Sequence, residues 1–188
     1  MEKKLESSLR IAINWLESHS YRYAVIGGIA VAEWGFLRFT EDVDIKVLVS
    51  MADYPALRGS LRTDFPQRAR PTIPENPAIV DVIIDGITVD FLFTIPGYDE
   101  LVIERTSKRD LDGWEIWVCS IEDLIIQKMY VSRGRDLYDV EELLIAHHEQ
   151  LDTNYVETWL TQFAEALDNP AILTEYHRLL AQAKSQNA

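Results

Sequence analysis

The chain has 188 residues, of which 47% are hydrophobic and 26% charged, values typical of a folded globular protein rather than a disordered, collagen-like or coiled-coil one. Eighteen Lys and Arg against 31 Asp and Glu give a net charge of -13, which opposes a broad nucleic-acid-binding surface and restricts any such contact to a local patch. A single cysteine excludes an internal disulfide, and the four histidines lack the spacing of zinc ligands.

The N-terminal segment predicts an amphipathic helix, because Leu5, Leu9, Ile13 and Leu16 recur at helical spacing. Its charges are scattered through the first 20 residues, unlike the compact apolar region of a secretory signal. No apolar run approaches the roughly 20 residues that span a bilayer. We therefore expect a cytoplasmic protein without membrane contact.

The next stretch combines two apolar runs with a glycine pair and two carboxylates. "YAVIGG" predicts a short buried strand that ends in a glycine turn, and residues 29–39 predict a helix. Residues 42–49 alternate: Val43 and its partners at every second position share one face, while Asp42, Asp44 and Lys46 share the other. This pattern predicts a strand with one buried and one polar face.

The remaining pattern predicts a mixed α/β region followed by helices. Residues 51–65 predict a helix interrupted near Pro55, and residues 66–77 a proline-rich loop. Residues 78–93 contain two β-rich runs separated by Asp85-Gly86, a hairpin signal, and Asp112-Gly113 suggests a second hairpin before the strand "WEIWV". From Ser120, which with Asp123 predicts a helix cap, helices are expected over residues 120–132, 136–150, 154–167 and 170–183. We expect an α/β core over 1–118 and a helical region over 119–188 packed on it as one compact domain.

Asp42 and Asp44 repel each other on one face of a strand unless a cation lies between them. Residues i and i+2 lie roughly 6.6 Å apart on one face. Two carboxylates about 5 Å apart repel by roughly 3 kcal/mol at an effective dielectric of 20. Hard oxygen ligands favour Mg²⁺ or Mn²⁺ over zinc. The alternative is a solvated strand entrance.

Two further features add to this pair. Asp90 lies in "GITVDFLFT", with Val89 and Phe91 on the opposite face, and could complete a three-carboxylate cluster of the kind that holds two metal ions. Gly27 and Gly28 lie between a strand and a helix, where glycine lets the backbone approach a phosphate. The alternatives are an exposed strand position for the acid and a simple tight turn for the glycines.

Lys128 lies on the apolar face of its predicted helix, and Asp136 on the inward face of the next, with Asp139 nearer the flank. A buried lysine is costly unless it is paired or meets an anion. The sequence leaves two alternatives: a structural ion pair between Lys128 and Asp136, or Lys128 on a nucleotide phosphate.

Basic residues also cluster, either as a local nucleic-acid contact or as scattered solvated side chains on an acidic protein. The clusters are Arg58, Arg62, Arg68 and Arg70, and then Arg105, Lys108 and Arg109.

These motifs resemble the nucleotidyltransferase superfamily with the DNA polymerase beta-type palm. The match comprises Gly27-Gly28, a helix, Asp42-Val43-Asp44 and the later acid in "VDF" at Asp90. More narrowly, "GGIAVAEWGFLRFTEDVDIKV" and "SIEDLIIQKMYVSRGRDLYDVEELL" are similar to the AbiEii-like group of small bacterial nucleotidyltransferases, many of which are toxins of toxin–antitoxin or phage-defence modules. The resemblance covers roughly residues 20 to 148.

The resemblance implies a mixed β-sheet flanked by helices, with a helical C-terminal region. It implies that Asp42 and Asp44 bind two Mg²⁺, and that Asp90 helps one of them activate the attacking hydroxyl. Gly27 and Gly28 would hold the triphosphate. This chain departs from the common Gly-Ser pair in having Gly28, which removes a possible hydroxyl ligand.

The resemblance also extends beyond the acids. Arg38 and Thr40 match an "R-x-T" segment that supports the loop or the phosphates. Lys128 matches a phosphate-facing lysine. The "RD-x-x-D" segment is matched by Arg135, Asp136 and Asp139, with Asp136 on the nucleotide side.

The expected activity is a Mg²⁺-dependent transfer of a nucleoside monophosphate from a nucleoside triphosphate to a hydroxyl on RNA, tRNA or protein. A small, aminoglycoside-like acceptor is an alternative that the net charge slightly favours. A third alternative is a degenerate palm that acts as a protein-binding partner or antitoxin.

Overall fold

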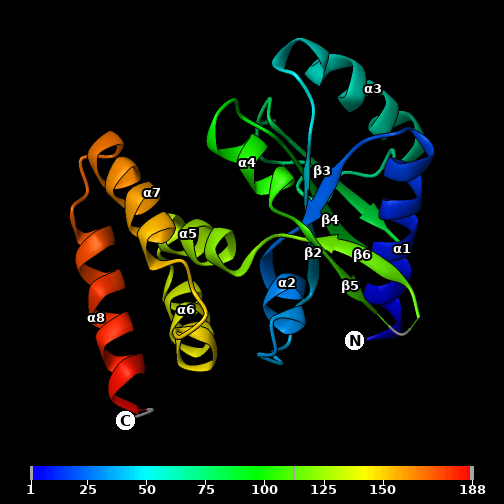
Figure 1. The fold of residues 1–188 in the computed structure, drawn as a ribbon. Coiled ribbons are helices and arrows are strands. Elements are labelled where there is room, and N and C mark those ends of the chain that lie inside the picture. Colours follow the sequence, from blue (N-terminus) through cyan, green and yellow to red (C-terminus); the bar gives the residue numbers. More distant parts are fainter. Residues whose placement is uncertain (1, 112, 187–188) are drawn as a thin grey trace. The chain divides into compact units, whose positions relative to one another are not determined.

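A computed structural model describes residues 2–111 and 113–186. The chain divides into two compact units, Met1–Ala30 with Phe39–Cys119, and Val31–Arg38 with Ser120–Ala188. The first unit contains a six-stranded mixed sheet in the order β3-β4-β2-β1-β6-β5, and the second is helical (Figure 1). The predicted mixed α/β fold is confirmed.

The helices and strands of the first unit follow the predicted order with one addition, α4, while β5 is the strand that the second predicted hairpin requires before "WEIWV". They are α1 (Lys3–Ser18), β1 (Tyr23–Val25), the start of α2 (Gly27–Glu33), β2 (Asp42–Val47), a 3₁₀ turn η1 (Met51–Asp53), α3 (Tyr54–Asp64), β3 (Ile79–Ile84), β4 (Ile87–Phe93), α4 (Tyr98–Glu104), β5 (Ser107–Asp110) and β6 (Glu115–Val118).

The sheet has a buried face and a face that carries carboxylates. On β2, Val43, Ile45 and Val47 are fully buried, as the alternation predicts. Helix α1 contacts β2, β3 and β4 and buries its own apolar stripe, which includes Leu9 and Ile13. Burial of these apolar side chains is the main stabilising contribution to this unit.

Two pairs of consecutive strands run antiparallel: β3 with β4, and β5 with β6. Asp85 and Gly86, with φ of 51° and 82°, form the predicted turn between β3 and β4. β5 pairs antiparallel with β6. The second predicted turn contains Asp112, which lies outside the described residues.

Two helix predictions are wrong in their bounds. The helix expected over 29–39 spans Gly27–Glu33, and Gly35 follows in a left-handed conformation at φ 99° that no helix continues. Pro55 does not interrupt a helix but lies in the first turn of α3. Backbone N–H groups in the first turn have no acceptor within the helix, so the N–H that proline lacks costs no hydrogen bond there.

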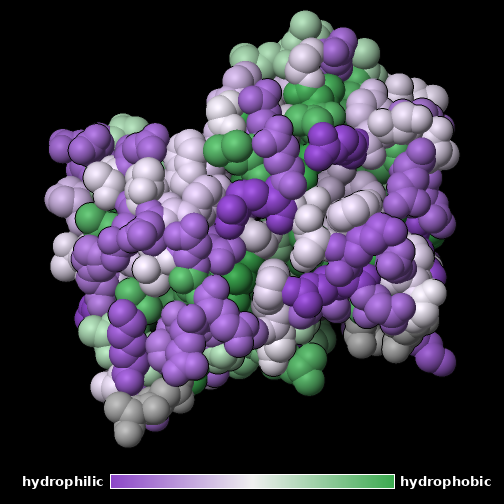
Figure 2. Space-filling view, viewed as in Figure 1, coloured by the Kyte–Doolittle hydropathy of each residue, from purple (hydrophilic) through white to green (hydrophobic). Residues whose placement is uncertain are grey.

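The second unit contains the four predicted helices: α5 (Ile121–Val131), α6 (Gly134–His147), α7 (Thr153–Ala166) and α8 (Ala171–Gln186). The Ser120 hydroxyl accepts a hydrogen bond from the Asp123 N–H at 3.1 Å, which confirms the predicted cap. Among the described helices, none is long and apolar enough to span a bilayer. Hydrophilic side chains predominate on the surface seen in Figure 2, and apolar ones form small separate patches.

Candidate functional site

A row of three carboxylates runs across β2, β4 and the edge strand β3. The parallel register of β2 and β4 sets Asp44 opposite Asp90, and the antiparallel register of β3 and β4 sets Asp81 opposite Asp90. Residues directly opposite one another share a face, and neighbouring strands lie about 4.8 Å apart. We call Asp44, Asp90 and Asp81 the acid row, and Asp42 lies two residues before Asp44 on the same face.

Gly27 lies directly against Asp44. Gly27 has a φ of 64°, and a Cβ built on it would be 2.1 Å from Oδ2 of Asp44, far inside van der Waals contact. The neighbouring Ile26 N–H donates to the Asp44 carbonyl at 3.0 Å. The turn after β1 therefore requires glycine for two reasons: its left-handed backbone and the space that the carboxylate occupies.

Asp42 is exposed but is held by a buried neighbour. The hydroxyl of Thr40 donates to Oδ1 of Asp42 at 3.0 Å. Two residues after Asp44 on the same face, Lys46 is buried and ion-paired with Asp99 of α4. The polar face of β2 thus has carboxylates at one end and a neutralised lysine at the other.

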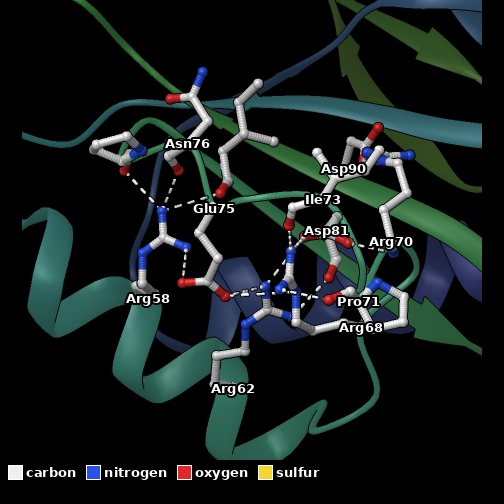
Figure 3. A network of polar contacts seen from close by, with 12 residues as sticks. Arg58, Arg62, Arg68, Arg70, Pro71, Ile73, Glu75, Asn76, Asp81 and Asp90 are labelled. Carbon is white, nitrogen blue, oxygen red and sulfur yellow. Dashed lines mark hydrogen bonds and ion pairs between the residues drawn. The ribbon is translucent and has the colours of Figure 1, made fainter.

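Asp81 is surrounded by one backbone N–H donor and two guanidinium groups (Figure 3). The Arg70 N–H donates to its Oδ2 at 2.6 Å, while Arg62 and Arg68 lie 3.2 and 3.5 Å from its Oδ1. Burial raises the pKa of Asp81, but the Arg70 N–H and the two guanidinium groups lower it by more. The net result is a pKa below the ordinary value, so Asp81 is held as a carboxylate.

Arg58 joins Arg62 and Arg68 in fastening the loop before β3. Arg58 donates to the carbonyls of Asn76, Pro77 and Ile79 at 2.5, 2.9 and 3.0 Å. Glu75 accepts ion pairs from Arg58, Arg62 and Arg68 at 3.2, 3.0 and 3.5 Å. The expectation that these arginines are scattered and solvated is therefore wrong: they form one network with acids and carbonyls (Figure 3).

Arg70 is the member of this network that reaches Asp90. Its guanidinium donates to Oδ1 of Asp90, and its side chain is 40% exposed against 16% for the acid. Burial raises the pKa of Asp90, Arg70 partly offsets this, and the charges of Asp81 and Asp42 raise the pKa again. The net pKa lies above the ordinary value, which makes Asp90 a better proton acceptor than a surface carboxylate.

The chemistry of these donors fits Mg²⁺ or Mn²⁺, which take carboxylate oxygens. Gly27 leaves Asp44 the room that a larger residue would fill. Within residues 2–111 and 113–186, however, no three acidic, His or Cys side chains are grouped closely enough to hold a metal ion. In this arrangement the cation beside Asp90 is Arg70.

A second charged cluster lies in the helical unit. Nζ of Lys128 lies 2.6 Å from Asp139 and 3.4 Å from Asp136, and Nε of Arg38 lies 2.9 Å from Asp139. Lys128 is 5% exposed and Asp139 fully buried. The expectation that Asp139 lies on the flank is wrong, because the buried stripe of α6 runs through positions 139, 140, 143 and 144. Asp139, rather than Asp136, is the main partner of Lys128.

The predicted site residues thus fall into two groups, each described within its own unit. The first unit holds Gly27, Gly28, Thr40, Asp42, Asp44 and Asp90, and the second holds Arg38, Lys128, Asp136 and Asp139. Arg135 is exposed in the first turn of α6. The phosphate contact expected for Lys128 stays a prediction.

Sequence reasoning did not identify Asp81 or Arg70 as site residues. A signal for Asp81 was present, because a two-residue turn at Asp85-Gly86 pairs Ile84 with Ile87 and, counting outward, Asp81 with Asp90. No local signal places Arg70, since it lies in an irregular loop whose path depends on contacts with β3.

Comparisons with known proteins identify a family for the chain and structures that share its fold. The model of a family described as "Nucleotidyltransferase of unknown function (DUF6036)" matches residues 7–182. No curated protein sequence matches the chain.

Several solved structures share the fold. An antigenic nucleotidyltransferase-like protein from Paracoccidioides brasiliensis is 18% identical, over 93% of this chain and 94% of its own, with a TM-score of 0.54. A putative nucleotidyltransferase from Thermotoga maritima is 16% identical, over 78% and 96%, with a TM-score of 0.54. The antibiotic-resistance factor ANT(2'')-Ia is 16% identical, over 95% and 99%, with a TM-score of 0.59.

These likenesses confirm the predicted nucleotidyltransferase-type fold, and the family match confirms the superfamily. The AbiEii-like subgroup stays a prediction. The chain belongs to the nucleotidyltransferase family whose model spans its residues 7–182.

Proposed function

We propose that this chain transfers a nucleoside monophosphate from a nucleoside triphosphate to a hydroxyl acceptor and releases pyrophosphate. Membership of a nucleotidyltransferase family supports this reaction class. The observation that carries the proposal is the register of β2 with β4, which sets Asp44 and Asp90 side by side while Gly27 lies against Asp44.

The roles follow from the placement of each side chain. Asp42, Asp44 and Asp90 would hold Mg²⁺ or Mn²⁺, which when bound stabilises the charge that develops on the transferred phosphoryl group. Asp90, which lies opposite Asp44 in the sheet, would help a bound metal ion activate the acceptor hydroxyl. Thr40 orients Asp42, and the backbone at Gly27 and Gly28 holds the triphosphate.

For the helical unit we propose that Lys128 neutralises the triphosphate, with Arg38 and Asp136 supporting it. The buried pair between Lys128 and Asp139 favours a second role, because it holds α5 and α6 together.

We propose RNA, tRNA or protein as the acceptor and the cytoplasm as the compartment. As the role we propose that of a toxin in a toxin–antitoxin or phage-defence module, related to the AbiEii-like group. A small antibiotic-like acceptor is the second candidate, favoured by the likeness to an antibiotic-resistance factor. A degenerate palm that binds a partner protein is disfavoured by the presence of all three expected acids.

The test is incubation of the chain with α-labelled nucleoside triphosphates and Mg²⁺, together with total tRNA, lysate protein or a set of aminoglycosides. We expect label in one of these acceptors for wild type and none for Asp44→Asn. Asp85→Asn is the matched control, because it removes the same charge from an exposed turn of the same sheet. Equal transfer by Asp44→Asn and Asp85→Asn would overturn the proposal.

A further inference from the structure

Arg70 is the arginine of this network whose guanidinium contacts Asp90. Arg58 binds loop carbonyls, and Arg62 and Arg68 bind Asp81 and Glu75, so these three guanidinium groups are occupied in fastening the loop. Arg70 is fastened by its backbone N–H to Asp81, which leaves its half-exposed guanidinium to reach Asp90 (Figure 3). The chain therefore places one partly exposed cation, anchored by its backbone N–H, beside Asp90.

Arg70 lies on the side of the acid row away from the glycine turn. The sheet order β3-β4-β2-β1 sets the Gly27 turn beside Asp44 on β2, then Asp90 on β4, then Asp81 and Arg70 at β3. In-line displacement requires the leaving pyrophosphate and the attacking hydroxyl on opposite sides of the phosphorus. If Gly27 and Gly28 hold the triphosphate, as the proposed function requires, Arg70 lies on the acceptor side.

We propose that Arg70 binds a phosphate of the acceptor, adjacent to the hydroxyl that is modified, and that in the ligand-free chain its guanidinium is held by Asp90. A metal ion held at Asp90 would neutralise the carboxylate that now pairs with Arg70, and the released guanidinium would bind a phosphate through two parallel N–H donors. The acceptor is therefore anionic near its hydroxyl, as is the 3′ end of RNA or a sugar phosphate. A polycationic aminoglycoside would meet repulsion from Arg70.

The first test uses Mn²⁺ alone and requires no turnover. Arg70→Gln should bind Mn²⁺ about tenfold more tightly than wild type, because the competing cation is gone. Arg70→Lys should resemble wild type because it keeps the charge. Arg22→Gln, an exposed arginine of the same unit, is the control for net charge. Equal Mn²⁺ affinity in Arg70→Gln and Arg22→Gln would overturn the proposal.

Asp44→Asn separates this proposal from the proposed function. Loss of Mn²⁺ binding in Asp44→Asn supports the metal site itself, whatever the result for Arg70. Mn²⁺ binding that Asp44→Asn leaves unchanged would overturn the metal site, and the assignment of Arg70 with it.

The second test compares acceptors with and without a phosphate: the dinucleotide ApA, which is adenosine extended by one nucleotide, against adenosine, and ribose 5-phosphate against ribose. Wild type should prefer the phosphorylated member of at least one pair, and that pair identifies nucleic acid or a small phosphate as the source. In Arg70→Gln, KM for the phosphorylated member should rise about tenfold relative to KM for the uncharged member, so that this preference is lost. An equal loss on both members, or transfer by wild type only to a cationic acceptor, would overturn the proposal.

Discussion

Gly27→Ala tests whether the turn after β1 is built around Asp44. The new Cβ would lie 2.1 Å from Oδ2, 2.9 Å from Cγ and 3.0 Å from Cβ of Asp44, so the whole carboxylate side chain must move. Rotation of the terminal carboxylate alone would not relieve the contact. We therefore expect Asp44 to be displaced by about 1 Å from the position that faces Asp90, since non-bonded carbon contacts optimise near 3.5–4.0 Å.

The free energy of unfolding should fall for two separable reasons. A non-glycine residue in the left-handed region costs about 1–2 kcal/mol. Overpacking adds about 1–3 kcal/mol. Gly86→Ala is the matched control, because Gly86 has a φ of 82° with nothing within 4 Å of its added Cβ. Gly86→Ala should therefore lose about 1–2 kcal/mol and Gly27→Ala about 2–5 kcal/mol.

The assay is urea denaturation of both variants alongside label transfer from nucleoside triphosphates. Gly27→Ala should lose transfer in buffers where it is still folded, because its Asp44 no longer faces Asp90. Gly86→Ala should keep transfer despite its lower stability. Equal destabilisation of the two variants together with normal transfer by Gly27→Ala would refute the reasoning.

Three further predictions concern buried charges. Lys128→Met should lower the free energy of unfolding by about 3–5 kcal/mol, because it leaves Asp139 with one fewer cationic partner. A double-mutant cycle with Asp139→Asn should show a coupling of at least about 1 kcal/mol, and strict additivity would contradict the pair. Since the pKa of Asp81 is lowered, its carboxylate stabilises the fold above pH of about 4, and this contribution is lost as the pH falls through the folded pKa. The deficit of Asp81→Asn, about 1–3 kcal/mol at pH 7, should therefore shrink toward pH 2 in urea titrations, and a constant deficit would contradict the assignment. Asp90 has a raised pKa, so its contribution to stability is present below the unfolded pKa and lost as the pH rises through the folded pKa. Asp90→Asn should abolish transfer yet unfold at pH 7 with a free energy equal to wild type or up to about 1 kcal/mol higher, whereas a large loss would indicate a structural role for Asp90.

Patterns that repeat within one element could be predicted from the sequence. Alternation in residues 42–47 predicts the buried face of β2 and the carboxylates on its other face, because successive side chains of a strand point to opposite faces of the sheet. The hairpin at Asp85-Gly86 follows from turn chemistry, because both residues accept positive φ. Both predictions depend on neighbours within a few residues.

Features set by distant contacts could not be predicted in this way. α4 has seven residues, too few for a periodic signal to stand out. The path of the loop that carries Arg70 depends on Asp81, which lies on the following strand. Asp139 is buried because cations from two other segments neutralise it, Lys128 and Arg38, and periodicity carries no information about partners.

Anomalous diffraction from crystals grown with Mn²⁺ tests the central claim most directly, because it locates the ion without reference to activity. A site formed by Asp42, Asp44 and Asp90 predicts an anomalous peak bounded by these three carboxylates, with Arg70 moved off Asp90. A peak bound elsewhere, or a fully loaded crystal in which Arg70 still pairs with Asp90, would contradict it.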